Sequence, residues 1–227
     1  MKELDVNFKD RKEAGQILAN KLSNYAGQNV LVLGLPRGGV PVAFEVAKAL
    51  KAPLDIYVVR KLGVPGHEEL AMGAIASGDV RVLNKPVIED LRISEEAIEA
   101  ETRKEQEELK RRELLYRGDR PTLDVSNRTV ILVDDGIATG STIKAGIAAL
   151  KKQKARRIVV AVPVAPASTI EELKTEVDEV ICVSTPEFFY AISLWYDDFP
   201  QTSDEQVREL LKEAEMTKEV AVAAGSQ

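Results

Sequence analysis

The feature that most constrains this chain is one short segment, residues 130–142, with the sequence VILVDDGIATGST. Its four leading apolar residues predict a buried β-strand, and two adjacent carboxylates, Asp134 and Asp135, follow that strand directly. A turn of small residues then leads into a segment with the apolar period of a helix. Because ligands bind beyond the carboxyl ends of strands in open parallel α/β sheets, the segment predicts a ligand site in such a fold.

The turn of this segment, residues 136–142, has the composition of a phosphate site. Its Gly, Ser and Thr residues offer backbone N–H groups and hydroxyls, and the dipole of the following helix favours an anion. With the carboxylates beside it as acceptors for hydroxyl groups, a sugar phosphate is the ligand class that fits. A P-loop fits less well, because Gly136 and Gly140 lie too close together and no Lys follows Gly140. A helix cap followed by a tight turn is the structural alternative.

The rest of the chain alternates strand-like and helix-like segments. Strands are predicted at residues 30–35, 55–59, 130–133, 157–162 and 177–183, and helices at residues 11–25, 38–50, 141–152, from 168 onward and 203–216. This order predicts an α/β fold with a central, mainly parallel sheet and helices on both faces. Residues 71–84 differ and predict two short strands around a turn. Residues 95–116 predict a highly charged helix that projects from the body or lies exposed on it.

Composition argues against several classes of protein. The net charge of −6 argues against a nucleic-acid-binding face. The single cysteine, Cys182, permits no disulfide framework and indicates a reducing, cytoplasmic compartment. The start of the chain has no apolar signal core, and no apolar run approaches the ~18 residues of a membrane helix. One cysteine and one histidine also argue against a zinc site.

A second loop with ligand-binding chemistry is Arg37-Gly38-Gly39, which also follows a predicted strand and opens a helix. Consecutive glycines let the backbone approach a ligand closely, and their N–H groups can form an anion nest. Arg37 adds a permanent charge with a fork suited to phosphate oxygens. A structural turn between strand and helix would also account for the glycines.

Three more features are candidates for the same site. Arg60 and Lys61 follow the strand predicted at residues 55–59, where they could face the pocket or be solvated surface cations. The stretch 62–69 is glycine-rich and polar, and its His67 could exchange a proton near neutral pH or be an ordinary surface residue. Aromatic side chains gather at residues 186–199 and could stack on a flat base or form core. Within that stretch the residues with polar handles are Trp195, Tyr196 and Asp197.

The segment at residues 130–142 resembles the phosphoribosyl-pyrophosphate (PRPP) binding motif of type I phosphoribosyltransferases. That motif has an apolar strand, two acidic residues, four spacer residues and Gly-x-Thr, and every position is matched here. With LPRGGVPVA, VVRKLGVPGHEE and FxxxxxWYDDF, residues 10–212 resemble an uncharacterised bacterial and archaeal phosphoribosyltransferase-like group. The resemblance implies one domain of the type I fold over residues 1–227. Within it, residues 60–117 would form a flexible-loop, hairpin and charged-helix insertion, and residues 184–216 an aromatic hood.

The resemblance also implies an activity: transfer of a 5-phosphoribosyl group from PRPP to a nitrogenous acceptor, such as a nucleobase, with release of pyrophosphate. Mg²⁺ would arrive with PRPP, without direct protein ligands. A non-catalytic PRPP or nucleotide sensor on the same fold stays open as the alternative. Neither nucleic acid nor membrane is expected as a partner, and a homodimer is expected because dimers are common in this fold.

Each candidate residue receives a role from the resemblance. Asp134 and Asp135 would be the catalytic residues, holding the ribose hydroxyls, with Asp135 or a loop residue helping to remove a proton from the acceptor. His67 would be a loop acid or base. The family's pyrophosphate loop often contains a cis peptide, expected here at Leu35–Pro36 or Pro36–Arg37. The 5′-phosphate would bind to Ala138, Thr139, Gly140, Ser141 and Thr142. Pyrophosphate would bind to Arg37, Gly38, Gly39, Arg60 and Lys61, and the acceptor to Trp195, Tyr196 and Asp197.

Overall fold

Five parallel strands form the main sheet of the computed structural model, which describes residues 6–224. Their order across the sheet is β2-β1-β6-β7-β8. β1 and β6 are neighbours, and their register pairs Gly34 with Val133 at the carboxyl ends. The strand bounds are β1 Val30–Gly34, β2 Leu54–Ile56, β6 Thr129–Val133, β7 Arg157–Val164 and β8 Glu179–Ser184. The predicted α/β fold with a central parallel sheet is confirmed.

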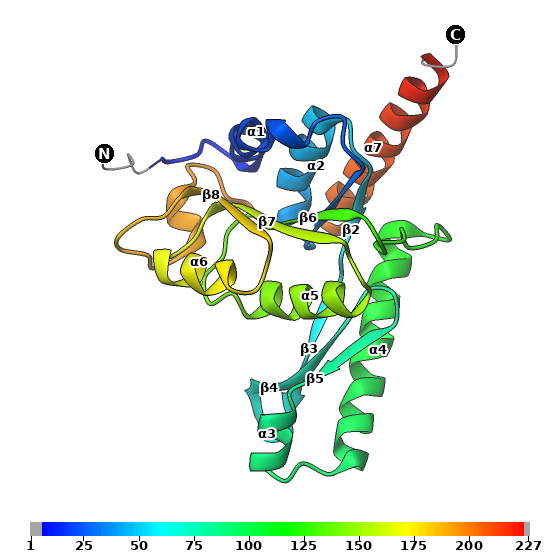
Figure 1. The fold of residues 1–227 in the computed structure, drawn as a ribbon, viewed down its shortest axis with the longest axis vertical. Coiled ribbons are helices and arrows are strands. Elements are labelled where there is room, and N and C mark those ends of the chain that lie inside the picture. Colours follow the sequence, from blue (N-terminus) through cyan, green and yellow to red (C-terminus); the bar gives the residue numbers. More distant parts are fainter. Residues whose placement is uncertain (1–5, 225–227) are drawn as a thin grey trace.

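Helices cover both faces of this sheet, with α1 and α2 on one side and α5 and α6 on the other (Figure 1). The helix bounds are α1 Arg11–Lys21, α2 Gly39–Leu50, α5 Ser141–Lys152, α6 Ala167–Lys174 and α7 Asp204–Ala224. Successive side chains of a strand point to opposite faces, so each central strand supplies both layers. Val30 and Val32 pack in the core beneath α1 and α2, whereas Leu31 and Leu33 pack in the core above α5.

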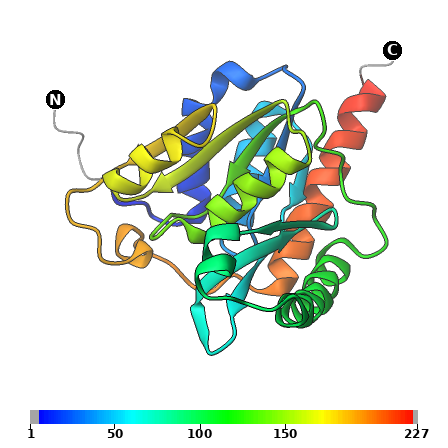
Figure 2. The ribbon, with the colours of Figure 1, turned by 60° about the horizontal axis from the view of Figure 1, so that its bottom comes forward.

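A second, antiparallel sheet extends away from the main sheet (Figure 1) and comes forward in Figure 2. Its strand order is β3-β4-β5, and two helices complete the unit, which we call the hairpin module, residues 59–117. The bounds are β3 Val59–Val64, β4 His67–Ala76, β5 Val80–Leu83, α3 Lys85–Asp90 and α4 Glu95–Arg117. The turn between β3 and β4 is Pro65-Gly66, in which Gly66 has φ 78°. This left-handed conformation suits glycine, which has no Cβ to clash.

The hairpin module corrects two sequence predictions. The strand expected at residues 55–59 is split into β2 and β3, which belong to different sheets. The glycine-rich loop expected at residues 62–69 is instead a β-hairpin, with Val64 paired to His67 across the turn. Antiparallel pairing between β3 and β4 satisfies the backbone of this segment, which the glycine-rich sequence did not indicate. The two strands expected within residues 71–84 are confirmed as β4 and β5.

Helix α4 lies along the projecting module, as expected for a highly charged helix, but one of its faces is buried (Figure 1). Ile98, Leu109 and Tyr116 are buried in the core beside the small sheet. Its last residue, Arg117, anchors the module to the main sheet, because its Nε donates to both carboxylate oxygens of Asp55 at 2.9 and 3.0 Å. The side chains of this pair are 4% and 7% exposed.

Polar side chains cap the N-termini of α1 and α7. The backbone N–H of Glu13 donates to the Asp10 side chain, and Ser203 and Gln206 cap each other reciprocally. α1 is shorter than predicted, since a 3₁₀ turn over residues 23–25 follows it. α7 continues beyond the predicted end at residue 216. Among the described residues, no helix has both the length and the apolar character needed to cross a bilayer.

Candidate active site

Two loops meet at the carboxyl edge of the main sheet. One follows β1 and contains Gly38 and Gly39, and the other follows β6 and contains Asp134 and Asp135. The glycines are needed here for close approach, since Gly38 has an ordinary helical φ of −61°. A Cβ on Gly38 would lie 2.0 Å from Oδ2 of Asp135, and one on Gly39 would lie 2.9 Å from Cα of Asp134. The structure therefore brings the two predicted ligand loops into direct contact.

The first of these loops also contains a cis peptide bond between Pro36 and Arg37. This is one of the two positions expected from the resemblance. Arg37 is only partly buried and lies 3.7 Å from the Asp204 carboxylate at the start of α7. Its guanidinium thus stands at the edge of the loop, where it is accessible to an anion.

The two carboxylates of the acidic pair have different surroundings. The Asp134 carboxyl accepts from the backbone N–H of Asp135 at 2.9 Å and has a side-chain hydrogen bond with the Asp135 carboxyl. Burial and the neighbouring charge of Asp135 raise the pKa of Asp134 well above its usual value. The Asp135 carboxylate instead accepts from Nε of Arg11 at 2.8 Å, and the backbone carbonyl of Asp135 accepts from the Tyr196 hydroxyl at 2.6 Å.

Arg11 is the functional-site residue that the sequence analysis missed. It is the first residue of α1, and its guanidinium also donates to the carbonyl of Pro200 at 2.7 Å and lies 3.7 Å from the centre of the Phe199 ring. In the sequence nothing distinguishes Arg11 from Lys12, the next basic residue of the same helix. Only the tertiary packing of α1 against the hood, residues 184–216, reveals its position.

The predicted phosphate turn leads directly into α5. The backbone N–H of Ile137 donates to the carbonyl of Val164, and the Thr169 hydroxyl donates to the carbonyl of Ala138, so the turn is fixed to β7 and α6. Gly140 caps α5 in a left-handed conformation with φ 73° and provides no side-chain cap. The surrounding side chains leave four turn residues exposed: Ala138, Thr139, Ser141 and Thr142. The start of α5 is thus open to an anion, as expected for a helix N-terminus that binds phosphate.

The hairpin module separates the two predicted basic residues. Successive residues of β3 point to opposite faces. Arg60 turns toward α4, where its Nε donates to the buried Glu105 carboxylate at 2.6 Å. Lys61 turns toward α5 and lines a hollow of about 370 Å³ together with Ser141. Of the two, the structure brings Lys61 to the phosphate turn, whereas it places Arg60 in an ion pair with α4.

His67 and the hood lie apart from each other. His67 is exposed at the first position of β4, beside the turn of the hairpin. Tyr196 is 6% exposed, and its ring lies 5.4 Å from that of Phe8 and 4.7 Å from that of Phe199. Its hydroxyl is already engaged by Asp135, so the structure places Tyr196 in the core rather than on an open face.

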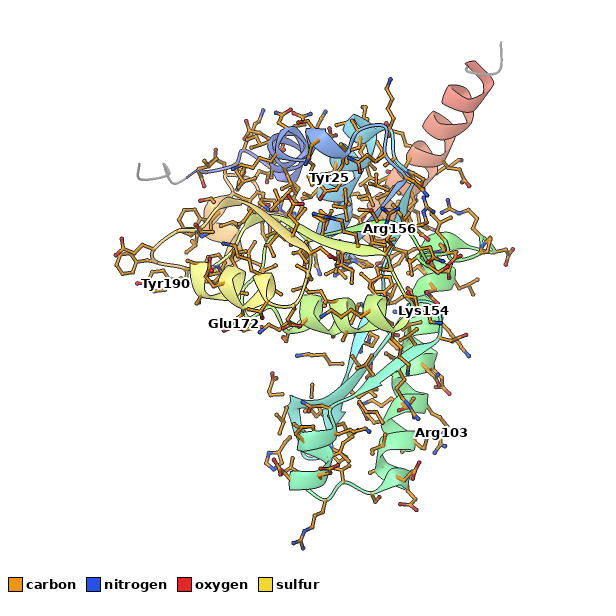
Figure 3. The ribbon with its side chains drawn as sticks, in the orientation of Figure 1. Tyr25, Arg103, Lys154, Arg156, Glu172 and Tyr190 are labelled. Carbon is orange, nitrogen blue, oxygen red and sulfur yellow. The ribbon has the colours of Figure 1, made fainter. Side chains whose placement is uncertain are left out.

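The remaining hood aromatics divide between packed and exposed positions. Trp195 packs against the core beneath α1, and its indole Nε1 is buried without a hydrogen-bond partner among the described residues. Asp197 is exposed and accepts a hydrogen bond from Asn7. Phe188 and Tyr190, which the sequence analysis did not select, are 68% and 83% exposed, and Tyr190 points outward from its loop in Figure 3.

Within residues 6–224, no group of three or more His, Cys, Asp or Glu side chains is arranged to hold a metal ion. The acidic pair offers adjacent carboxylates, which Mg²⁺ prefers, but no third protein ligand. This donor set fits a magnesium ion that keeps most of its ligands from water and from a bound phosphate compound.

Several known proteins are similar to this chain in sequence or fold. A family model described as the phosphoribosyl transferase domain matches residues 6–198. Relatives from two strains of Mycobacterium tuberculosis, provisionally named phosphoribosyl transferases, are 47% identical over 207 residues. These alignments cover 91% of this chain and 47% of each relative, so the chain spans about half the length of the curated relatives it matches. The crystal structure of TT1426 from Thermus thermophilus is similar, with a TM-score of 0.83 and 40% identity, and covers 92% of this chain and 99% of that chain.

Proposed function

The chain belongs to the phosphoribosyl transferase domain family, and from this premise we propose that it transfers a 5-phosphoribosyl group from PRPP to a nitrogenous acceptor. The observation that carries the proposal is the direct contact between the loop at Gly38-Gly39 and the acidic pair Asp134-Asp135. One loop would offer the N–H of Gly38 and the cation of Arg37 to pyrophosphate. The other would offer carboxylates to ribose hydroxyls and an open helix start to the 5′-phosphate. PRPP carries these three groups in one molecule.

The reaction requires the protein to hold the ribose while the bond to pyrophosphate breaks. Like glycoside cleavage, it passes through a ribose with oxocarbenium character, which water would capture if it entered. The acidic pair would fix the ribose through its hydroxyls, and residues 138–142 would fix its 5′-phosphate. Two fixed ends leave the reacting carbon little freedom relative to the acceptor, which lowers the entropic cost of the transfer.

Pyrophosphate leaves with several negative charges, which the protein has to stabilise. Arg37 and the N–H of Gly38 would do this at the edge of the sheet, whereas the N–H of Gly39 already donates to the carbonyl of Leu35 at 3.0 Å. Lys61 would approach from the hairpin module, since it faces the same hollow as Ser141. Magnesium bound with PRPP would supply further positive charge to the pyrophosphate oxygens.

A pyrophosphate-release assay tests the proposed activity. The full chain is incubated with PRPP and MgCl₂ and screened over purine, pyrimidine and other nitrogenous acceptors, with the Asp134→Asn variant as the matched control. Release that requires both one acceptor and the Asp134 carboxylate is the expected result. PRPP binding without release for every acceptor would instead support the sensor, and release unchanged in Asp134→Asn would contradict the assigned site.

A further inference from the structure

One member of the acidic pair, Asp135, forms an ion pair with Arg11 near the start of the chain. Nε of Arg11 donates to Oδ2 of Asp135 at 2.8 Å, and the two side chains are only 10% and 12% exposed. The same guanidinium donates to the carbonyl of Pro200 and stacks on Phe199. These three contacts fix the plane of the guanidinium, and with it the orientation of the carboxylate that it holds.

Asp135 is enclosed from its other sides as well. Gly38 leaves no room beside its carboxylate, since even a methyl group there would lie 2.0 Å from Oδ2. Its carbonyl accepts from the Tyr196 hydroxyl at 2.6 Å, so the hood holds the backbone too. The ion pair, the glycine beside the carboxylate and the hydroxyl on its backbone together fix the position of Asp135.

Asp134 differs from Asp135 in its partners. Its carboxyl accepts a hydrogen bond from the N–H of Asp135 and also has a side-chain hydrogen bond with the Asp135 carboxyl. Among the described residues Asp134 has no ion-pair partner, whereas Asp135 is paired with Arg11. The cation thus holds one carboxyl of the pair directly and the other only through its neighbour.

We propose that Arg11 is a positioning residue that holds the Asp135 carboxylate in place and couples it to the hood, residues 184–216. This proposal rests on the proposed function and deepens it. The arrangement makes the hood and the acidic pair a single unit, because Arg11 and Tyr196 connect both to Asp135. A shift of the hood would move Asp135, and loss of the ion pair would loosen the hood.

The first test needs no ligand and uses the single tryptophan of the chain, Trp195, which is next to Tyr196. Arg11→Met and Asp135→Asn should each shift the emission of Trp195 to longer wavelength, and Asp134→Asn should leave it unchanged. The double variant Arg11→Met/Asp135→Asn leaves no unpaired buried charge and guards against a variant that fails to fold. Emission unchanged in both single variants of the ion pair would overturn the coupling.

The second test is a double-variant cycle on the binding of PRPP, ribose 5-phosphate and pyrophosphate, with MgCl₂ present. Arg11→Met and Asp135→Asn should each weaken PRPP and ribose 5-phosphate about tenfold, corresponding to one lost charge-assisted contact. The double variant should be no weaker than either single one, because both remove the same interaction. Pyrophosphate affinity should change less than about twofold, which a merely destabilised protein would not show.

Asp134→Asn removes a different carboxyl from the one that Arg11 holds, so its effect on ribose 5-phosphate should add to that of Arg11→Met. Additive losses for Arg11→Met and Asp135→Asn would overturn the positioning role of Arg11. If the unaltered chain binds no PRPP, the proposed function fails, and the emission of Trp195 still decides whether Arg11 couples the hood to the acidic pair.

Discussion

At the residue scale, burial gives one of two adjacent carboxylates an unusual affinity for protons. Asp134 lies at the end of a buried strand beside the charge of Asp135, and both conditions disfavour its ionised form. A site that needs an ionised Asp134 therefore carries a cost in stability. Such a cost is common where binding residues are held in surroundings that do not suit them.

Replacing Asp134 by Asn should stabilise the fold at pH 7.5 by about 1 kcal/mol while PRPP binding is lost. Because the pKa of Asp134 is raised in the folded state, the folded protein binds this proton more tightly than the unfolded chain does. The free energy of unfolding therefore falls as the pH rises from the usual pKa of an aspartate to the raised value. The advantage of Asp134→Asn should therefore grow with pH and vanish near pH 3.8 and below. Urea unfolding at several pH values measures this, and an advantage independent of pH would contradict the assigned pKa.

Replacing Gly38 by Ala should damage both the site and the fold. The new Cβ would lie 2.0 Å from Oδ2 of Asp135, so the loop or the acidic pair has to move, at a cost of about 1–3 kcal/mol. Gly146→Ala in α5 is the matched control, because its Cβ would meet ordinary contacts from 3.4 Å outward. Thermal unfolding and PRPP titration compare the two, and PRPP binding by Gly38→Ala equal to that of Gly146→Ala would refute the contact.

The sequence revealed part of this site at the residue scale. The acidic pair and the glycines were identifiable because their chemistry and their positions after apolar strands are local. Arg11 was not identifiable, since its partner Asp135 lies 124 residues away and no local pattern links them. Tyr196 was chosen for its polar hydroxyl, but that hydroxyl serves the backbone of Asp135 inside the core.

At the scale of elements, the alternation of β3 gives neighbouring cations different tasks. Lys61→Ala should weaken PRPP about tenfold by removing one cation near the phosphate turn. Arg60→Ala should leave PRPP affinity nearly unchanged and instead lower stability by about 1–3 kcal/mol, because Glu105 loses its 2.6 Å partner. Titration and urea unfolding of both variants check this, and the reverse pattern would show that the faces of β3 are misassigned.

The buried ion pair between Arg117 and Asp55 should hold the hairpin module to the main sheet. Arg117→Met leaves a buried carboxylate unpaired and should lower the free energy of unfolding by about 3–5 kcal/mol. Arg112→Met is the control, because its pair with Glu108 is about one-third exposed and contributes about 0.5 kcal/mol. Equal losses in the two variants, measured by urea unfolding, would show that the anchor is unimportant.

The strands and helices of the main sheet were predictable because apolar periodicity is a local property. The hairpin at residues 59–76 was not, since Gly63, Pro65 and Gly66 have the composition of a loop. Pairing across the turn outweighs that local preference, and the same Pro-Gly dipeptide that suggested a loop forms the turn itself.

At the scale of the whole molecule, the candidate site lies between the carboxyl edge of the main sheet and the hairpin module. The acidic pair, the glycine loop and the phosphate turn belong to the main sheet, whereas Lys61 and His67 belong to the hairpin module (Figure 1). The sequence predicted an insertion with a hairpin at this position, but not that β3 pairs with β4 to make a three-stranded sheet. The homodimer and the cytoplasmic location stay predictions.

Calorimetric titration of the full chain with PRPP, with and without MgCl₂, is the decisive measurement for the proposed site. We expect saturable binding that strengthens with Mg²⁺ and disappears in Asp134→Asn, although that variant is folded and more stable. Absence of binding to the folded, unaltered chain, or equal binding by Asp134→Asn, would contradict the claim that residues 130–142 form a PRPP site.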